Sequence, residues 1–167
     1  MSVLSSKQDE ERFEHVIQDK QPLLRSLARR ILHNAADADD AVMNALMKAW
    51  TRRLLLRTPE KLAAWLCRIV VNESYSLLRK RKRERTVPLE SSHDAPVLDD
   101  EANRLALERL EDAIARLPQP YRETVHIGML SGLDTQTAAQ ILGCNANALY
   151  QRIHKAKAML KEMLHDE

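Results

Sequence analysis

The chain has 167 residues and a formal net charge of +2, and 44% of its residues are hydrophobic, which suits one or two small folded domains. It contains only 3 Gly and 6 Pro, and its apolar residues recur at helical spacing, so we predict an all-α protein. No apolar run approaches the roughly 20 residues of a membrane span, and the polar, acidic N-terminal segment does not resemble a signal peptide, so we expect a cytoplasmic protein without membrane insertion.

Three helices are predicted in the N-terminal part. The first has an apolar stripe, with Pro22 marking a break or restart, that comprises Phe13, Val16, Ile17, Leu24, Leu27, Ala28 and Ile31. Asp37 is a suitable N-cap for a second helix that ends near Trp50, with inward positions Ala38, Ala41, Val42, Ala45, Leu46 and Ala49. Thr58 followed by Pro59 predicts the start of a third helix, which runs to about Lys82 with Leu62, Leu66, Ile69 and Val70 inward.

A flexible linker is predicted at residues 85–100, because this segment has two prolines, small polar residues, acids and no helical period. The second domain begins near Glu101, with inward positions Leu105, Leu110, Ala113, Ile114 and Leu117. Pro118 and Pro120 interrupt that helix, and another runs from Tyr121 to about Leu130. The predicted organisation is therefore two small helical domains, 1–84 and 101–167, joined by the linker.

Residues 132–164 predict a helix-turn-helix at the C-terminal end. A short helix begins at Thr135, Gly143-Cys144-Asn145 breaks it, and a longer helix from about Ala146 has Leu149, Ile153, Ala156, Leu160 and Met163 on one stripe. The opposite face is polar, has almost no acid, and comprises Asn147, Tyr150, Gln151, His154, Lys155 and Ala158. Such a face suits a DNA major groove, and the alternative is an ordinary helical hairpin with a solvated basic face.

Charge is unevenly distributed along the chain. Basic residues outnumber acids in 1–83 and in 113–161, whereas acids outnumber basic residues between these blocks. Basic blocks indicate a polyanionic partner, with locally biased solvated surface as the alternative, and the acidic strip would repel DNA phosphates.

Catalytic residues, metal sites and cofactors are not predicted. The six His residues are scattered without metal-ligand spacing, and Gly is too rare for a phosphate-binding loop, so we do not expect an enzyme. Cys67 and Cys144 lie among apolar helical positions and are expected to be buried free thiols. Trp50 and Trp65 are expected in the core, which leaves no series of exposed aromatic side chains for stacking on single-stranded DNA and predicts limited intrinsic power to melt DNA.

Three stretches resemble the extracytoplasmic-function (ECF, group 4) sigma factors of bacterial RNA polymerase, within the sigma-70 family. They are ADDAVMNALMKAW (38–50), WLCRIVVNESYSLLRKRKR (65–83) and LPQPYRETVHIGMLSGLDTQTAAQILGCNANALYQRIHKAKAML (117–160). The resemblance implies that 1–84 is region 2, which docks on core polymerase and handles the minus-ten element. It implies that 101–167 is region 4, which reads the minus-thirty-five element, and that the linker threads the RNA path of polymerase.

Site residues follow from this resemblance together with the helix faces. Minus-thirty-five contacts are expected from Asn147, Tyr150, Gln151, Arg152, His154 and Lys155, with Gln suited to adenine and Arg or Lys to guanine. Lys157 and Lys161 are expected on phosphates. Minus-ten contacts are expected from the loop at about 51–61 and from Asn72, Ser76, Arg79, Lys80 and Arg83, with Arg81 and Lys82 also on phosphates. Polymerase docking is assigned to Asp39, Asp40, Met43, Asn44 and Met47.

Structural alternatives stay open for several of these residues. Arg152 is expected either to contact DNA or to pair within its domain, and Asn72 either to hydrogen-bond a flipped base or to serve in helix packing. Met43 and Met47 either face polymerase or complete the internal core, and the basic tail at 79–83 also complements the helix dipole.

The resemblance implies a transcription initiation factor that is monomeric when free, binds core RNA polymerase and promoter DNA, and acts in a stress response. It also implies control by an anti-sigma factor. The alternatives are a stand-alone helix-turn-helix regulator, which would usually dimerise on a two-fold operator, and a helical adaptor with no DNA role.

Overall fold

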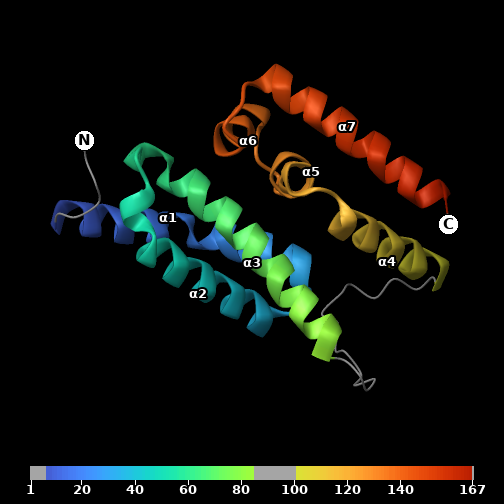
Figure 1. Cartoon of the computed structure of the whole chain (residues 1–167), viewed down its shortest axis with the longest axis horizontal. Helices are drawn as coiled ribbons and strands as arrows, with labels where there is room; N and C mark the ends of the chain where they lie inside the picture. The colour runs from blue at the N-terminus through green and yellow to red at the C-terminus, as the bar shows by residue number, and fades with distance from the viewer. Residues whose placement is uncertain (1–6, 85–100, 167) are drawn as a thin grey trace. The chain divides into compact units, whose positions relative to one another are not determined.

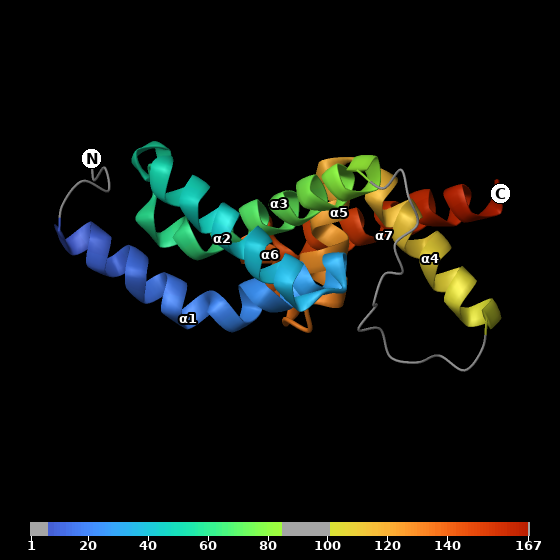
Figure 2. The same cartoon turned by 90° about the horizontal axis from the view of Figure 1, so that it is seen from below.

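A computed structural model describes residues 7–84 and 101–166, and all regular secondary structure in these ranges is helical (Figures 1 and 2). The chain divides into two compact units, unit 1 (Met1–His93) and unit 2 (Asp94–Glu167). The predicted all-α class with two small helical domains and a C-terminal helix-turn-helix is confirmed. The predicted linker at 85–100 lies outside the described residues. Among the helices described, none is both long and apolar enough to cross a membrane.

Unit 1 consists of three long helices, each packed on the other two, as Figures 1 and 2 show. They are α1 (Lys7–Leu32), α2 (Ala35–Thr51) and α3 (Leu62–Glu84). The predicted stripes form the shared core, with Leu24, Leu27, Ala28, Ala41, Ala45, Ala49, Leu66, Val70 and Val71 almost completely shielded from solvent. Small Ala side chains on the buried face of α2 let its backbone approach α1 and α3 closely.

The prediction that Pro22 breaks the first helix is wrong. Helix α1 continues through Pro22, which is exposed, while Leu24 and Leu27 on the other side are buried. Pro at this place removes one backbone N–H on the solvent side, and packing of the buried stripe on α2 and α3 stabilises the continuous helix.

The prediction that Asp37 caps α2 is also wrong. Asn34 is the N-cap, and its Oδ1 accepts a hydrogen bond from the backbone N–H of Asp37 at 3.0 Å. Asn and Asp are equally good caps, so local sequence alone does not choose between them. The Asp37 side chain is instead buried in unit 1.

Two short 3₁₀ turns connect α2 to α3: η1 (Arg53–Leu55) and η2 (Pro59–Lys61). The predicted helix from Pro59 therefore starts as a 3₁₀ turn and becomes α-helical only at Leu62. Thr58 precedes this turn, but its side chain makes no capping hydrogen bond.

Unit 2 contains α4 (Glu101–Arg116), α5 (Gln119–Glu123), the π-helix η3 (Thr124–Leu130), α6 (Thr135–Ile141) and α7 (Ala146–His165). The helix predicted at Tyr121–Leu130 thus begins earlier, at Gln119, and widens into the π-helix. The prediction that Leu105 faces inward is wrong, since it is 49% exposed. Helix α4 buries Ala113 and Ile114 near its C-terminal end, whereas its first turns are exposed.

The helix-turn-helix consists of α6, a glycine turn and α7. Asp134 caps α6 by accepting hydrogen bonds from Thr137 N at 2.9 Å and Thr137 Oγ1 at 2.7 Å. Gly143 has φ +68°, and the N–H groups of Gly143 and Cys144 donate back to carbonyls of α6, which is the Schellman arrangement. Asn145 then caps α7 through Ala148 N at 2.8 Å.

Candidate nucleic-acid interface

The polar face predicted on the last helix is exposed on α7. All six predicted members are exposed, namely Asn147, Tyr150, Gln151, His154, Lys155 and Ala158, and the nearby Lys157 and Lys161 are exposed as well. Leu149, Ala156 and Leu160 on the other side are buried. The first acid of α7 is Glu162, so the exposed surface of its first four turns is cationic and suited to a DNA groove.

Two side chains of this face are held by other elements of unit 2. Tyr150 Oη lies 3.5 Å from Thr135 Oγ1 at the start of α6, within reach of a weak hydrogen bond. Lys155 Nζ lies 5.5 Å from the centre of the Tyr121 ring, in a cation–π arrangement. These contacts restrict both side chains before any partner binds.

Arg152 differs from its neighbours because it is half-buried. Its Nη1 donates to the Leu142 carbonyl at 3.5 Å and so joins α7 to the end of α6. Of the two roles predicted for Arg152, this contact supports pairing within the domain.

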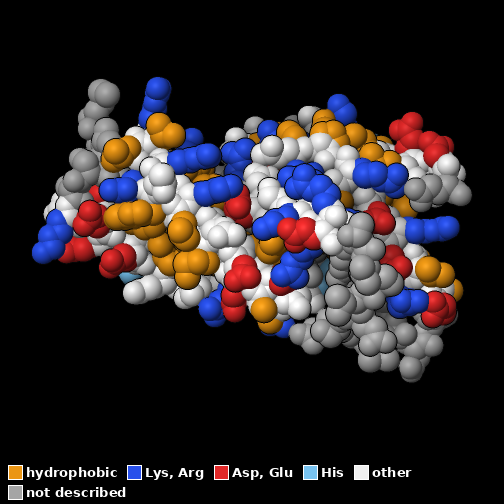
Figure 3. Space-filling model, turned by 60° about the horizontal axis from the view of Figure 1, so that its bottom comes forward, with side chains coloured by type: hydrophobic (Ala, Val, Ile, Leu, Met, Phe, Trp, Pro, Cys, Tyr) orange, Lys and Arg blue, Asp and Glu red, His pale blue; other side chains and the backbone are white. Residues whose placement is uncertain are grey.

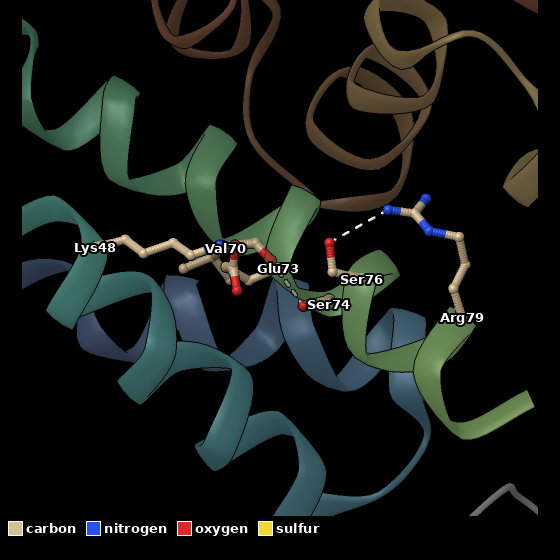
Figure 4. Close-up of polar contacts among 6 residues, drawn as sticks. All are labelled: Lys48, Val70, Glu73, Ser74, Ser76 and Arg79. Carbon is tan, nitrogen blue, oxygen red and sulfur yellow. Dashed lines mark hydrogen bonds and ion pairs between the residues drawn. The ribbon is translucent and has the colours of Figure 1, made fainter. Parts of the chain in front are cut away.

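A second polar face lies along α3 in unit 1. Ser76, Arg79, Lys80 and Arg83 are exposed, and Asn72 is half-buried with its Oδ1 atom shielded from solvent. Figure 4 shows Arg79 reaching back to Ser76, where Arg79 Nη2 donates to Ser76 Oγ at 3.3 Å. Helical spacing brings these five predicted minus-ten residues onto one face of α3.

Arg81 in the same basic tail has a partner that the sequence did not predict. Its guanidinium forms an ion pair with Asp37, whose carboxylate is almost completely buried at the start of α2. This contact gives Arg81 a structural role within unit 1, and its phosphate contact stays a prediction. A neighbouring cation, Lys80, lies 3.9 Å from Glu84 on the exposed surface.

A second ion pair links α3 to α2. Lys48 Nζ pairs with Glu73 Oε1, and Glu73 directly follows Asn72 (Figure 4). In the same turn, Ser74 Oγ donates to the Val70 carbonyl at 2.8 Å inside the unit. The predicted promoter-reading helix is thus anchored to the predicted docking helix next to Asn72.

The five docking residues Asp39, Asp40, Met43, Asn44 and Met47 are all exposed on α2. Met43 is 58% and Met47 61% exposed, so the alternative that they complete the internal core is wrong. Asp39 Oδ1 lies 3.1 Å from Arg25 Nε on α1, and this ion pair partly neutralises the negative charge of the docking surface at Asp39.

Trp50, expected in the core, is 38% exposed, and Trp65 is half-buried. The Trp50 ring meets Phe13 edge-on at 5.3 Å between centroids, and Arg53 Cζ lies 3.8 Å from the Trp50 ring centre. Leu54 and Leu55, which follow, are exposed, and sequence reasoning missed them because a run of three leucines usually indicates core.

Both cysteines are free thiols; Cys67 is buried, as predicted, whereas the prediction that Cys144 is buried is wrong, since it is half-buried. Burial raises the pKa of the Cys67 thiol to about 11. Within 7–84 and 101–166 no cluster of three or more His, Cys, Asp or Glu has metal-binding geometry.

Similarity to known proteins agrees with this arrangement. The sigma-70 region 2 model matches residues 16–84, and the sigma-70 region 4 model matches residues 107–160. The chain is 32% identical over 141 residues to the ECF RNA polymerase sigma factor SigM of Mycobacterium tuberculosis, covering 84% of this chain and 71% of SigM. It is 31% identical over 147 residues to the ECF RNA polymerase sigma factor EcfG of Rhodopseudomonas palustris, covering 86% and 80% of the two chains. The chain belongs to the ECF sigma factors of the sigma-70 family.

The fold of this ECF sigma factor is similar to that of the sigma factor RpoE of Bartonella quintana, crystallised with the anti-sigma factor NepR. The TM-score is 0.53 and the identity 31%, covering 92% of this chain and 96% of RpoE. The region 2 match contains α2 and α3 with both of their polar surfaces, and the region 4 match contains α6, the glycine turn and α7 as far as residue 160.

Proposed function

We propose that this ECF sigma factor, of the group 4 type, binds core RNA polymerase in the cytoplasm and directs promoter-specific transcription initiation. The observation that carries the proposal is the pair of exposed cationic helix faces, one on α3 in region 2 and one on α7 in region 4. Two basic reading surfaces on one chain suit two promoter elements bound by a single monomer. Residues 1–84 act as the minus-ten and docking module, 85–100 as linker and 101–167 as the minus-thirty-five module.

Site roles follow the exposed faces. Gln151 and Lys155 read base edges of the minus-thirty-five element, with Asn147, Tyr150 and His154 beside them. On α3, Asn72 and Ser76 contact the minus-ten element, and Arg79, Lys80 and Arg83 bind nearby phosphates. Asp39, Asp40, Met43, Asn44 and Met47 form the docking surface for polymerase, in which exposed methionines adapt to an apolar partner helix.

In vitro transcription with purified core polymerase and fragmented genomic DNA tests the proposal. We expect discrete run-off transcripts that disappear without the protein and fall sharply with Asn72→Ala or Lys155→Ala. Glu162→Ala, on the late part of α7, is the control and is expected to transcribe normally. Tight binding of the protein alone to a two-fold operator, without polymerase-dependent initiation, would indicate a stand-alone regulator instead.

We also propose control by an anti-sigma factor during a stress response, since the similar RpoE of B. quintana was crystallised with the anti-sigma factor NepR. Affinity capture from unstressed cells should recover an inhibitor, and capture after stress should recover core polymerase. Recovery of polymerase alone under both conditions would contradict this regulation.

A further inference from the structure

The cation–π contact between Lys155 and Tyr121 joins the exposed face of α7 to an element outside the helix-turn-helix. Lys155 Nζ lies 5.5 Å from the centre of the Tyr121 ring, within the distance at which an aromatic ring attracts a cation. Tyr121 belongs to α5, which packs on α7. The position of the Lys155 ammonium is therefore linked to the position of a side chain on another helix.

The Tyr121 ring is held at a defined place in unit 2. The backbone N–H groups of Tyr121 and Arg122 both donate to the Pro118 carbonyl, at 3.0 and 3.1 Å. Arg122 Nη1 donates to the Ala115 carbonyl at 3.2 Å, which joins α5 to the end of α4. Tyr121 is itself half-buried. The ring is thus part of the packed unit, and it gives the lysine a fixed point of contact.

The lysine side chain starts from a well-anchored part of α7. Ala156, the next residue, is completely buried, and so is Leu149 nearly two turns earlier. The Lys155 side chain is exposed and has several rotatable bonds, so ordering it on a DNA base costs conformational entropy. A contact that already restrains the free side chain lowers that cost.

A ring restrains a lysine without cancelling its charge. On the face of the molecule drawn in Figure 3, acidic side chains lie beside several of the Lys and Arg side chains. Lys48 and Lys80, for example, pair with Glu73 and Glu84. The contact that Lys155 makes is instead with an uncharged ring, which attracts the ammonium through its quadrupole. The full positive charge therefore remains for the acceptor atoms of a guanine.

We propose that Tyr121 is a positioning residue for Lys155, which it restrains so that the ammonium donates to the acceptors of one guanine in the minus-thirty-five element. This inference rests on the proposed function and adds to it a determinant of base specificity that lies outside the helix-turn-helix. Without the ring, Lys155 keeps its charge but occupies more rotamers, from which it reaches phosphates as well as the base. Tyr121 therefore raises discrimination between bases more than it raises total affinity.

Competition binding of the reconstituted holoenzyme to its preferred promoter and to single-base variants of it tests the proposal. Lys155→Ala first identifies the promoter position at which Lys155 discriminates. We expect Tyr121→Leu, which keeps an apolar side chain without the ring, to reduce discrimination at that position by about threefold, as the loss of an exposed cation–π contact predicts. Discrimination at the other positions should be unchanged. Tyr121→Phe, which keeps the ring, should discriminate as the wild type does.

The double variant Tyr121→Leu/Lys155→Ala separates positioning from a purely structural role. Without Lys155 the ring has no ammonium to position, so the double variant should discriminate as Lys155→Ala alone does. A packing defect in unit 2 would instead weaken binding to all promoter variants alike and would persist without Lys155. Thermal unfolding of the free proteins checks their folding, and Tyr121→Met repeats the test should Tyr121→Leu fold less well.

Several results would count against the proposal or its basis. Unchanged discrimination in Tyr121→Leu, or equal weakening on every promoter variant, overturns the positioning role. A loss in Tyr121→Phe as large as that in Tyr121→Leu also overturns it, because the ring would then not be the group that matters. Wild-type discrimination by Lys155→Ala contradicts the base contact through which Tyr121 is proposed to act. Failure of the wild-type protein to support polymerase-dependent initiation contradicts the proposed function itself.

Discussion

The carboxylate of Asp37 at the start of α2 forms an ion pair with the guanidinium of Arg81 near the end of α3. Asp37 is buried, whereas the Arg81 side chain is 38% exposed, so the arginine reaches inward from the basic tail to neutralise a buried charge. The pair joins the helix proposed to dock on polymerase to the helix proposed to contact the minus-ten element. Together with Lys48 and Glu73, it connects α2 and α3 at two places.

Removal of Arg81 is therefore expected to destabilise unit 1. Arg81→Ala leaves the Asp37 carboxylate buried without its cation, which should cost about 2 kcal/mol of unfolding free energy. Urea denaturation followed by circular dichroism measures the change. The exposed neighbour Arg83 is the control, and Arg83→Ala should change the free energy of unfolding by less than about 0.5 kcal/mol. Equal destabilisation by the two variants would show that the ion pair contributes nothing specific.

Gly128 in the π-helix η3 allows α7 to pack closely. A Cβ atom built at Gly128 would lie 3.1 Å from Leu149 Cδ1, and Leu149 is completely buried on α7. Gly128→Ala is expected to destabilise unit 2 by about 1 kcal/mol, since overpacking outweighs the gain in helix propensity. Thermal unfolding measures this, with Met129→Ala on the exposed neighbour as control. A higher melting temperature for Gly128→Ala would mean that Leu149 moves aside without cost.

The N-cap of α6 gives unit 2 a pH-dependent contribution. Hydrogen bonds from the Thr137 hydroxyl and backbone N–H hold the pKa of Asp134 below its ordinary value of 3.8. A folded-state pKa below the unfolded one stabilises the fold above the unfolded value, and this contribution is lost as pH falls through the folded value. The melting temperature of Asp134→Ala should thus be lower than that of the wild type at pH 7, and the difference should shrink below about pH 4. Asp134→Asn keeps a capping oxygen but has no titrating group. The difference in melting temperature between Asp134→Asn and Asp134→Ala should therefore not shrink as the pH falls.

The two cysteines should differ in reactivity. The thiolate is the reactive form, and burial raises the pKa of Cys67 to about 11, so almost none of it is ionised at pH 8. We expect the half-buried Cys144 of the native protein to react quickly with Ellman's reagent, giving one equivalent of the coloured product. Cys67 should give a second equivalent only when the protein is unfolded. Cys144→Ala should remove the fast phase. Fast reaction in that variant would show that Cys67 is accessible in the native state.

Much of the fold was predictable from the sequence because it depends on local patterns. Such patterns depend on residues that are close in sequence, and the structure contains several of them as predicted. They are the apolar stripes of α1, α2 and α7 and the glycine turn before α7. The choice of Asn34 over Asp37 as cap was not predictable, because both residue types are good caps, and the ion pair of Asp37 with the distant Arg81 is a tertiary contact that local sequence does not show. Likewise, Leu54 and Leu55 form a run that is usual in a core, and only the tertiary packing shows that nothing in unit 1 covers them.

Gln151 and Lys157 on α7 should affect promoter binding in different ways. Gln151 lies on the predicted base-reading face, so Gln151→Ala should weaken holoenzyme binding to the preferred promoter and reduce discrimination at one position by about 1–3 kcal/mol. Lys157 is predicted on a phosphate, so Lys157→Ala should weaken binding to all promoters alike and lower the slope of log affinity against log salt by about 1. Competition binding of the holoenzyme to a set of single-base promoter variants, repeated at several salt concentrations, separates the two effects. If Gln151→Ala instead changed only the salt slope, the base-reading role would belong to another residue of this face, and Lys155 would be tested next.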